Sequence, residues 1–131
     1  MARLIHTMIR VLDEERSVAF YDRAFGLKPV DRLDFETFTL IYLANDATGF
    51  ELELTVNKGR TEAYALGDGY GHLAFVVKDL DAEHARLAAA GYGPRKLVDF
   101  QNAGVRVARF FFVADPDGYQ IEVIEEGGRF G

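Results

Sequence analysis

Polar and apolar residues alternate over eight short runs of the chain, a pattern typical of half-buried β-strands. These predicted strands span residues 3–11, 28–35, 38–43, 50–56, 70–77, 95–100, 105–114 and 119–125. Two further runs carry apolar residues at helical spacing. One helix is predicted between an N-cap at Asp13 and a stop at Gly26, and another between Asp79 or Asp81 and Gly91.

The order of the predicted elements occurs twice. A strand, an acid-capped helix, a glycine stop and three strands precede a polar, glycine-containing linker over residues 58–69, and the same order follows it. An internal repeat of this kind indicates one domain made of two related halves, or two small related units fused together. At 131 residues, the chain is long enough for one domain with a sizeable core.

Each half of the repeat carries one histidine early in its first strand and one glutamate inside its last strand. His6 corresponds to His72, and Glu53 corresponds to Glu122. A carboxylate among the apolar residues of a strand is costly unless a partner offsets its charge. Two imidazoles and two carboxylates form a ligand set suited to a divalent ion such as Ni, Co, Zn, Mn or Fe(II). On the residues alone, structural histidines and hydrogen-bonded carboxylates are an equal alternative to a metal site.

Arg10 and Asn57 are candidates for substrate contacts. Alternation puts them on the same strand faces as His6 and Glu53, about 13 Å further along. A surface guanidinium and a strand-end amide are the simpler alternatives, and the pattern alone favours them. Other basic residues that could hold an acidic ligand are Arg95, Lys96, Arg106 and Arg109. The third histidine, His84, is predicted to face solvent from the middle of its helix.

Composition narrows the function classes. The chain has no cysteine, which excludes disulfides, thiolate metal sites and a cysteine nucleophile. Its formal net charge of −6 argues against nucleic acid or an anionic membrane as a partner. No apolar run approaches the length of a membrane span, and the N-terminus lacks the basic-then-apolar order of a signal peptide. These features predict a cytoplasmic protein.

Several stretches together form a recognisable set: Leu4-Ile5-His6-Thr7-Met8-Ile9-Arg10-Val11, Glu53-Leu54-Thr55 with Asn57, Tyr70-Gly71-His72, and Asp115-Pro116-Asp117-Gly118-Tyr119-Gln120-Ile121-Glu122. This set resembles glyoxalase I (lactoylglutathione lyase), a family of the vicinal oxygen chelate superfamily. The similarity covers nearly the whole chain in one register. The Asp-Pro-Asp-Gly turn is shared across that functionally mixed superfamily, whereas the His-Thr-Met opening with all four candidate ligands is more specific.

The resemblance implies an α+β fold of the glyoxalase/bleomycin-resistance type, in which two βαβββ modules form curved mixed sheets around a metal. We expect one domain over residues 1–131, with an N-terminal module at 1–60 and a C-terminal module at 69–127. The resemblance also implies a homodimer whose sites combine ligands matching His6 and Glu53 of one chain with those matching His72 and Glu122 of the other. The short chain resembles the bacterial type, for which Ni or Co is favoured over Zn or Mn.

The implied reaction isomerises the hemithioacetal of methylglyoxal and glutathione to S-D-lactoylglutathione through an enediolate, which detoxifies methylglyoxal. In the implied chemistry, the metal acts as Lewis acid and template, and a carboxylate moves a proton from C1 to C2. That carboxylate is assigned to Glu122, with Glu53 as a ligand and second candidate base. Arg10 and Asn57 match positions of the family that bind the thiol.

One stretch departs from the family. Gln101-Asn102-Ala103-Gly104 occupies the place of a Lys-Gly-Gly-like loop that helps to hold the glutathione carboxylates, so another thiol is an alternative co-substrate. Two rival functions follow. One is a related enzyme with another substrate, such as an epimerase or an Fe(II) dioxygenase, although such dioxygenases typically use two histidines and one carboxylate. The other is a metal-free ligand-binding protein of the same fold, which has no need of two matched His and Glu pairs.

Overall fold

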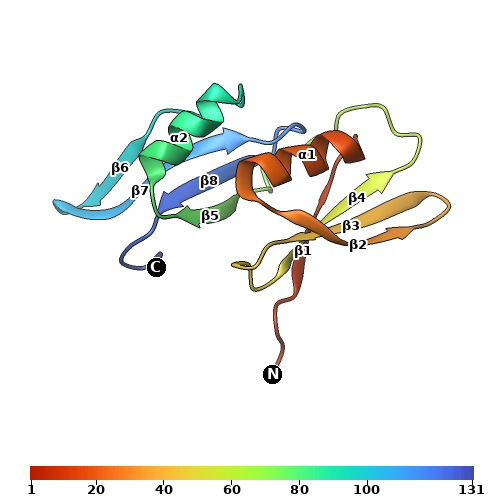
Figure 1. Cartoon of the computed structure of the whole chain (residues 1–131), viewed down its shortest axis with the longest axis horizontal. Helices are drawn as coiled ribbons and strands as arrows, with labels where there is room; N and C mark the ends of the chain where they lie inside the picture. Colours follow the sequence, from red (N-terminus) through yellow and green to blue (C-terminus); the bar gives the residue numbers. More distant parts are fainter. The chain divides into compact units, whose positions relative to one another are not determined.

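The structure is a computed structural model that describes all 131 residues (Figure 1). The chain divides into two compact units, Met1–Ala65 and Leu66–Gly131. Each unit contains one helix and one four-stranded mixed sheet, in the order strand, helix and three strands. The predicted α+β class and the predicted repeat are therefore confirmed. Neither helix is long and apolar enough to cross a membrane.

The first unit consists of β1 (His6–Arg10), α1 (Glu14–Phe25), β2 (Lys28–Asp34), β3 (Phe38–Ala44) and β4 (Glu51–Asn57). The strand order in its sheet is β1-β4-β3-β2. β1 runs parallel to β4, whereas β3 is antiparallel to both β2 and β4. The first strand and the last strand of the unit therefore lie side by side.

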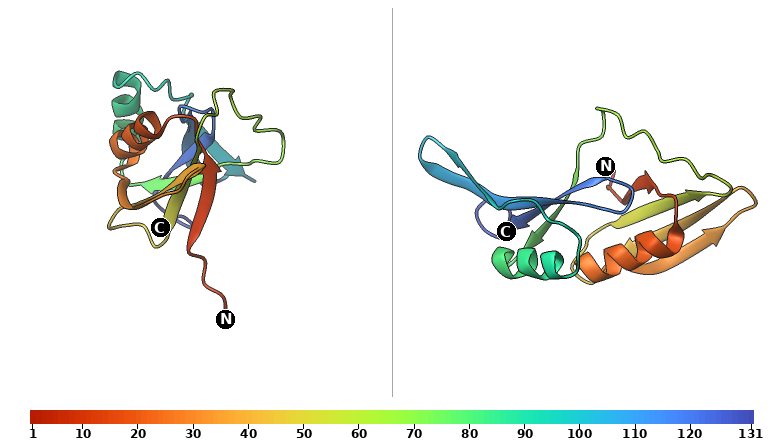
Figure 2. Two further views of the ribbon diagram at one scale, coloured as in Figure 1. Left: turned by 90° about the vertical axis from the view of Figure 1, so that its right-hand side faces the viewer. Right: turned by 90° about the horizontal axis from the view of Figure 1, so that it is seen from above.

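Helix α1 begins and ends where its sequence predicts. The Asp13 side chain accepts a hydrogen bond from the Arg16 amide at 2.9 Å, and Gly26 ends the helix with a φ of 66°. Phe20, Tyr21 and Ala24 form a buried stripe. In Figure 2, each helix lies along one face of the sheet of its own unit. The sheet buries Ile9, Ile41, Leu43, Leu52 and Leu54.

The alternation of β4 leaves the other face of the first sheet to polar residues. Buried Leu52 and Leu54 alternate with Glu51, Glu53 and Thr55, as the sequence predicts. The outer strand β2 is exposed along its whole length. It carries Pro29 and several charged side chains, which suit an edge strand because they discourage pairing with another chain.

The second unit consists of β5 (Leu73–Val77), α2 (Leu80–Ala89), β6 (Val98–Asn102), β7 (Val105–Ala114) and β8 (Gln120–Glu125). Its strand order is β5-β8-β7-β6, and β5 runs parallel to β8. The topology is therefore that of the first unit. Asp79 is the N-cap of α2 and accepts a hydrogen bond from the Ala82 amide at 3.0 Å. The core of this unit includes Leu80, Leu87, Phe111, Val113, Ile121 and Val123.

The Asp-Pro-Asp-Gly turn before β8 forms as the sequence predicts. The buried carboxylate of Asp115 accepts hydrogen bonds from the amides of Asp117 and Tyr119 at 2.9 and 3.0 Å. The Gly118 amide donates to the Asp115 carbonyl, and Gly118 has a φ of 93°. This positive φ explains the glycine, because a side chain at this position would strain the backbone.

Three strands start three residues later than the sequence predicts. β1 starts at His6 and β5 at Leu73, because their partners β4 and β8 begin only at Glu51 and Gln120. β6 starts at Val98, since the paired part of this hairpin runs from there to the turn at residues 103–104. Alternation alone does not mark the residue at which regular pairing between two strands begins.

The prediction that His84 faces solvent is wrong. This histidine is half-buried. Its Nε2 atom lies 2.8 Å from the Arg95 carbonyl oxygen, and its ring packs edge-on against Phe111 at 4.9 Å. His84 therefore ties α2 to the segment before β6, which gives it a structural role.

Candidate functional site

The first predicted pair of ligands lies on the sheet face of the first unit that does not carry the buried leucines. The register of β1 and β4 places His6 opposite Glu51, so Glu53 lies one step further along the same face. The Nε2 atom of His6 is 3.2 Å from the Oε2 atom of Glu53. Glu53 is 8 % exposed, so the sheet holds a carboxylate that is nearly shielded from water.

The second predicted pair has the same construction. His72 directly precedes β5, whose first residue Leu73 is paired with Ile121 of β8. His72 therefore stands one step before Glu122 on a parallel neighbour, as His6 stands before Glu53. The Nε2 atom of His72 is 3.9 Å from the Oε1 atom of Glu122. The structure thus brings each predicted histidine to the glutamate of its own unit.

An aromatic ring packs against each histidine and lies opposite each glutamate. The ring of Tyr42 meets that of His6 edge-on at 5.9 Å, and Tyr42 is the β3 residue paired with Glu53. In the second unit, the ring of Phe112 meets that of His72 at 5.3 Å, and Phe112 is paired with Glu122. The two rings could not be assigned to the site from the sequence alone, because their place depends on strand register.

The two aromatic positions differ by one hydroxyl group. A hydrogen bond from the Tyr42 hydroxyl to the Glu53 carboxylate, with burial and the negative charge of Glu53, raises the pKa of Tyr42 to about 12. Phe112 has no donor to offer to Glu122. Glu53 therefore has a neutral hydrogen-bond donor across the strand, and Glu122 faces an apolar ring.

The donors suit a divalent metal. Imidazole nitrogens and carboxylate oxygens are ligands for ions such as Zn, Co and Ni, and each unit presents one of each on an open sheet face. No group of three or more such side chains that could hold a metal ion occurs in the chain, so each unit presents a single His and Glu pair. The buried Oε1 atom of Gln120, two residues before Glu122, has no hydrogen-bond partner. A polar ligand in this neighbourhood would give that atom a partner.

Arg10 and Asn57 occupy the open face of the first sheet with His6 and Glu53. Arg10 is exposed at the end of β1, and Asn57 is the last residue of β4. The side-chain amide of Asn57 donates a hydrogen bond to the Tyr64 hydroxyl at 2.9 Å. The Arg60 guanidinium lies 4.1 Å above the Tyr64 ring. The loop after β4 therefore fixes the orientation of the Asn57 amide.

Two of the other basic candidates are already engaged in ion pairs within the second unit. Arg106 makes a two-point ion pair with Asp99, and its hydrogen bonds hold the pKa of Asp99 below its ordinary value. Arg109 donates to Asp81 and Glu125, and the pKa of Asp81 is lowered for the same reason. An acidic ligand would have to compete with these carboxylates.

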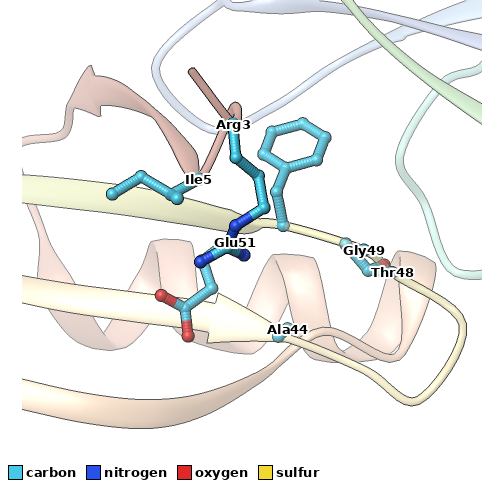
Figure 3. Close-up of a pocket in the computed structure, with 7 residues that line it drawn as sticks. Arg3, Ile5, Ala44, Thr48, Gly49 and Glu51 are labelled. Carbon is cyan, nitrogen blue, oxygen red and sulfur yellow. The ribbon is translucent and has the colours of Figure 1, made fainter. Parts of the chain in front are cut away.

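A shallow pocket of about 360 Å³ lies beside the start of β4, next to the His6 and Glu53 pair but not including it (Figure 3). In Figure 3, the Arg3 side chain extends toward Glu51. The pocket is lined by Arg3, Ile5, Ala44, Thr48, Gly49, Phe50 and Glu51. The lining of this pocket therefore does not include the candidate ligands His6 and Glu53.

Comparison with known proteins places these observations in a family. The sequence profile of the Glyoxalase/Bleomycin resistance protein/Dioxygenase superfamily matches residues 3–123. A probable lactoylglutathione lyase of Vibrio parahaemolyticus is 37% identical over 128 residues, which cover 94% of this chain and 90% of that protein. A lactoylglutathione lyase of Neisseria meningitidis is 38% identical over 128 residues, covering 95% and 91%.

A solved structure agrees with these sequence relatives. The trypanothione-dependent glyoxalase I of Leishmania major superimposes with a TM-score of 0.77 at 34% identity. The match covers 96% of this chain and 88% of that protein. The fold and the sequence similarity therefore extend over the same, nearly complete, length of the chain.

Proposed function

This chain belongs to the Glyoxalase/Bleomycin resistance protein/Dioxygenase superfamily, and on that premise we propose that it is a lactoylglutathione lyase. Its reaction isomerises the hemithioacetal of methylglyoxal and glutathione to S-D-lactoylglutathione and so removes methylglyoxal. The observation that carries this proposal is the matched pair of ligands: one His and one Glu meet in the same way in both units. Neither the epimerase or dioxygenase alternative nor the metal-free alternative gains support from the relatives.

His6, Glu53, His72 and Glu122 are the residues that hold the metal in this proposal. When bound, a divalent ion supplies Lewis-acid polarisation of the two substrate oxygens, which makes the adjacent C–H bond more acidic. Glu122 takes the proton from C1 of the hemithioacetal and returns it to C2, acting first as a base and then as an acid. Glu53 remains a ligand and is the second candidate base. Nickel or cobalt is the preferred ion, ahead of zinc and manganese.

Arg10 and Asn57 hold the thiol part of the substrate. Both lie on the sheet face that carries His6 and Glu53, at the end away from the start of the strands. A guanidinium suits a carboxylate of glutathione, and an amide supplies both a donor and an acceptor. The hydrogen bond to Tyr64 keeps Asn57 oriented before the substrate arrives.

Glutathione is the proposed thiol, and the second unit gives a reason to test other thiols as well. Its Arg106 and Arg109 are engaged with Asp99, Asp81 and Glu125. The turn at Ala103 and Gly104, with φ values of 53° and 80°, is a two-residue hairpin loop without a basic side chain. The Leishmania relative is described as trypanothione-dependent, which makes that dithiol a natural comparison.

The test of the function starts from metal-free protein. We would reload it separately with Ni, Co, Zn and Mn and follow thioester formation from methylglyoxal with glutathione, trypanothione or a simple thiol. The expected result is thioester formation that depends on the metal and is fastest with Ni or Co. Absence of thioester with every metal and every thiol would overturn the proposal.

A homodimer with sites shared between chains completes the proposal, because each unit contributes two ligands. The test mixes two inactive variants, His6→Ala/Glu53→Ala and His72→Ala/Glu122→Ala, under conditions that exchange subunits. In a heterodimer with shared sites, one site then has all four ligands and the other has none. Activity should return to about a quarter of the wild-type value for random association. If each site were formed within one chain, mixing would restore no activity.

A further inference from the structure

The two His and Glu pairs are equivalent in backbone position. In both units the histidine stands at or directly before the start of one strand, and the glutamate lies one step further along on the parallel neighbour of that strand. In both units the next antiparallel strand places an aromatic residue opposite the glutamate. Because the backbone is the same, a difference in behaviour between Glu53 and Glu122 must come from the side chains around them.

The aromatic position supplies one such difference. Tyr42 is paired with Glu53 across β3 and β4 and its ring packs against His6, so the Tyr42 hydroxyl is placed to donate a hydrogen bond to the Glu53 carboxylate. Phe112 packs against His72 in the same edge-on manner and offers no hydrogen bond to Glu122. A phenol is protonated at neutral pH, so the Tyr42 hydroxyl remains a donor under working conditions.

We propose that Tyr42 is a positioning residue that fixes the Glu53 carboxylate as a stationary ligand, and that the apolar Phe112 leaves Glu122 free to move the proton. A hydrogen bond to a ligating carboxylate restricts its rotation and so fixes its position. A base that takes up a proton must instead change its charge and its contacts during each turnover. The inference rests on the proposed function, and it explains why two glutamates in equivalent places have different roles.

The test exchanges the two side chains. Tyr42→Phe removes only the hydroxyl and installs the residue found in the second unit, and Phe112→Tyr is the reciprocal variant. Zn²⁺ and Co²⁺ affinities of the metal-free proteins are measured by calorimetry, without substrate. Loss of the hydrogen bond is expected to weaken metal binding by roughly tenfold. Glu53→Gln and Glu122→Gln are then compared in the wild-type and the Tyr42→Phe backgrounds. In the wild-type background, Glu122→Gln should lower kcat more than Glu53→Gln does. In the Tyr42→Phe background, the two losses of kcat should be closer to each other.

Phe112→Tyr keeps the inference testable if Tyr42→Phe fails to fold. The added hydroxyl can bond to Glu122 and should lower kcat while leaving metal affinity equal or higher. Unchanged metal affinity and an unchanged ratio between the two glutamate variants in Tyr42→Phe would overturn the inference. If the wild type forms no thioester, the proposed function fails, and the calorimetry still decides whether Tyr42 supports the metal ligand.

Discussion

The Nε2 atom of His6 lies 3.2 Å from a carboxylate oxygen of Glu53, across two parallel strands. The sheet holds this contact, because the two residues lie on neighbouring strands and share one face. The second unit repeats the contact with His72 and Glu122 at 3.9 Å. The histidines of the two pairs hold equivalent backbone positions, so both should contribute to metal binding.

Replacing either histidine by alanine should reduce metal affinity by roughly tenfold or more, and by similar factors at His6 and His72. The fold should persist, since both side chains are partly exposed, at 35% and 42%. Calorimetry with Ni²⁺ or Co²⁺ measures the affinity, and circular dichroism checks the fold. His84→Ala is the control, because it should lower the unfolding temperature and leave metal affinity intact. A His6 or His72 variant with wild-type affinity contradicts the assigned ligand set.

Glu122→Gln should keep the fold and lose activity by roughly 10²- to 10⁴-fold, the range that positioned acid–base groups contribute. Glutamine has nearly the same shape and cannot carry the proton, so the loss should appear in kcat more than in KM. Steady-state kinetics on metal-loaded protein measure both constants. A surviving kcat close to that of the wild type would assign the proton transfer to Glu53 or to water.

Much of this site follows from sequence because strand alternation and helix capping are local. The capped start at Asp13, the stop at Gly26 and the turn at Asp115 are each encoded within a few residues. The repeat then relates His6 to His72 and Glu53 to Glu122 without any knowledge of the sheet. The distances within each pair required the structure.

Features that depend on pairing between strands could not be predicted. The late start of β1 is set by where β4 begins, and the place of Tyr42 opposite Glu53 is set by the register of β3 and β4. Nothing within residues 38–43 specifies that register. His84 was misjudged for a similar reason, since its partners Arg95 and Phe111 come from distant parts of the chain.

Asp81→Asn should lower the stability of the folded protein near pH 7. It should also make that stability depend less on pH in the acid range. Arg109 donates to the Asp81 carboxylate at 2.7 and 2.9 Å and holds its pKa below the ordinary value. The unfolded chain therefore binds more protons than the folded one between the lowered pKa and about pH 4, so stability rises with pH across that window. The stabilisation is complete above the window and is lost as the pH falls through it.

Thermal unfolding of the wild type and Asp81→Asn from acid to neutral pH tests whether the stabilisation by this ion pair rises with pH. The difference in melting temperature should be constant above about pH 5 and should disappear in strong acid. Asp68→Asn, at an exposed acid of the linker, is the matched control and should follow the wild type. A difference that grows as the pH falls would contradict the role given to the Arg109 pair.

Tyr64→Phe should weaken binding of the thiol part of the substrate and leave the chemical step intact. The variant removes the hydroxyl that accepts a hydrogen bond from Asn57 at 2.9 Å, and it retains the ring beneath Arg60. One hydrogen bond that orients a binding residue corresponds to a rise in KM of about fivefold. Asn57→Ala should raise KM at least as much, and kcat should change little in either variant. If Asn57→Ala raises KM and Tyr64→Phe does not, the amide is held in place without the loop.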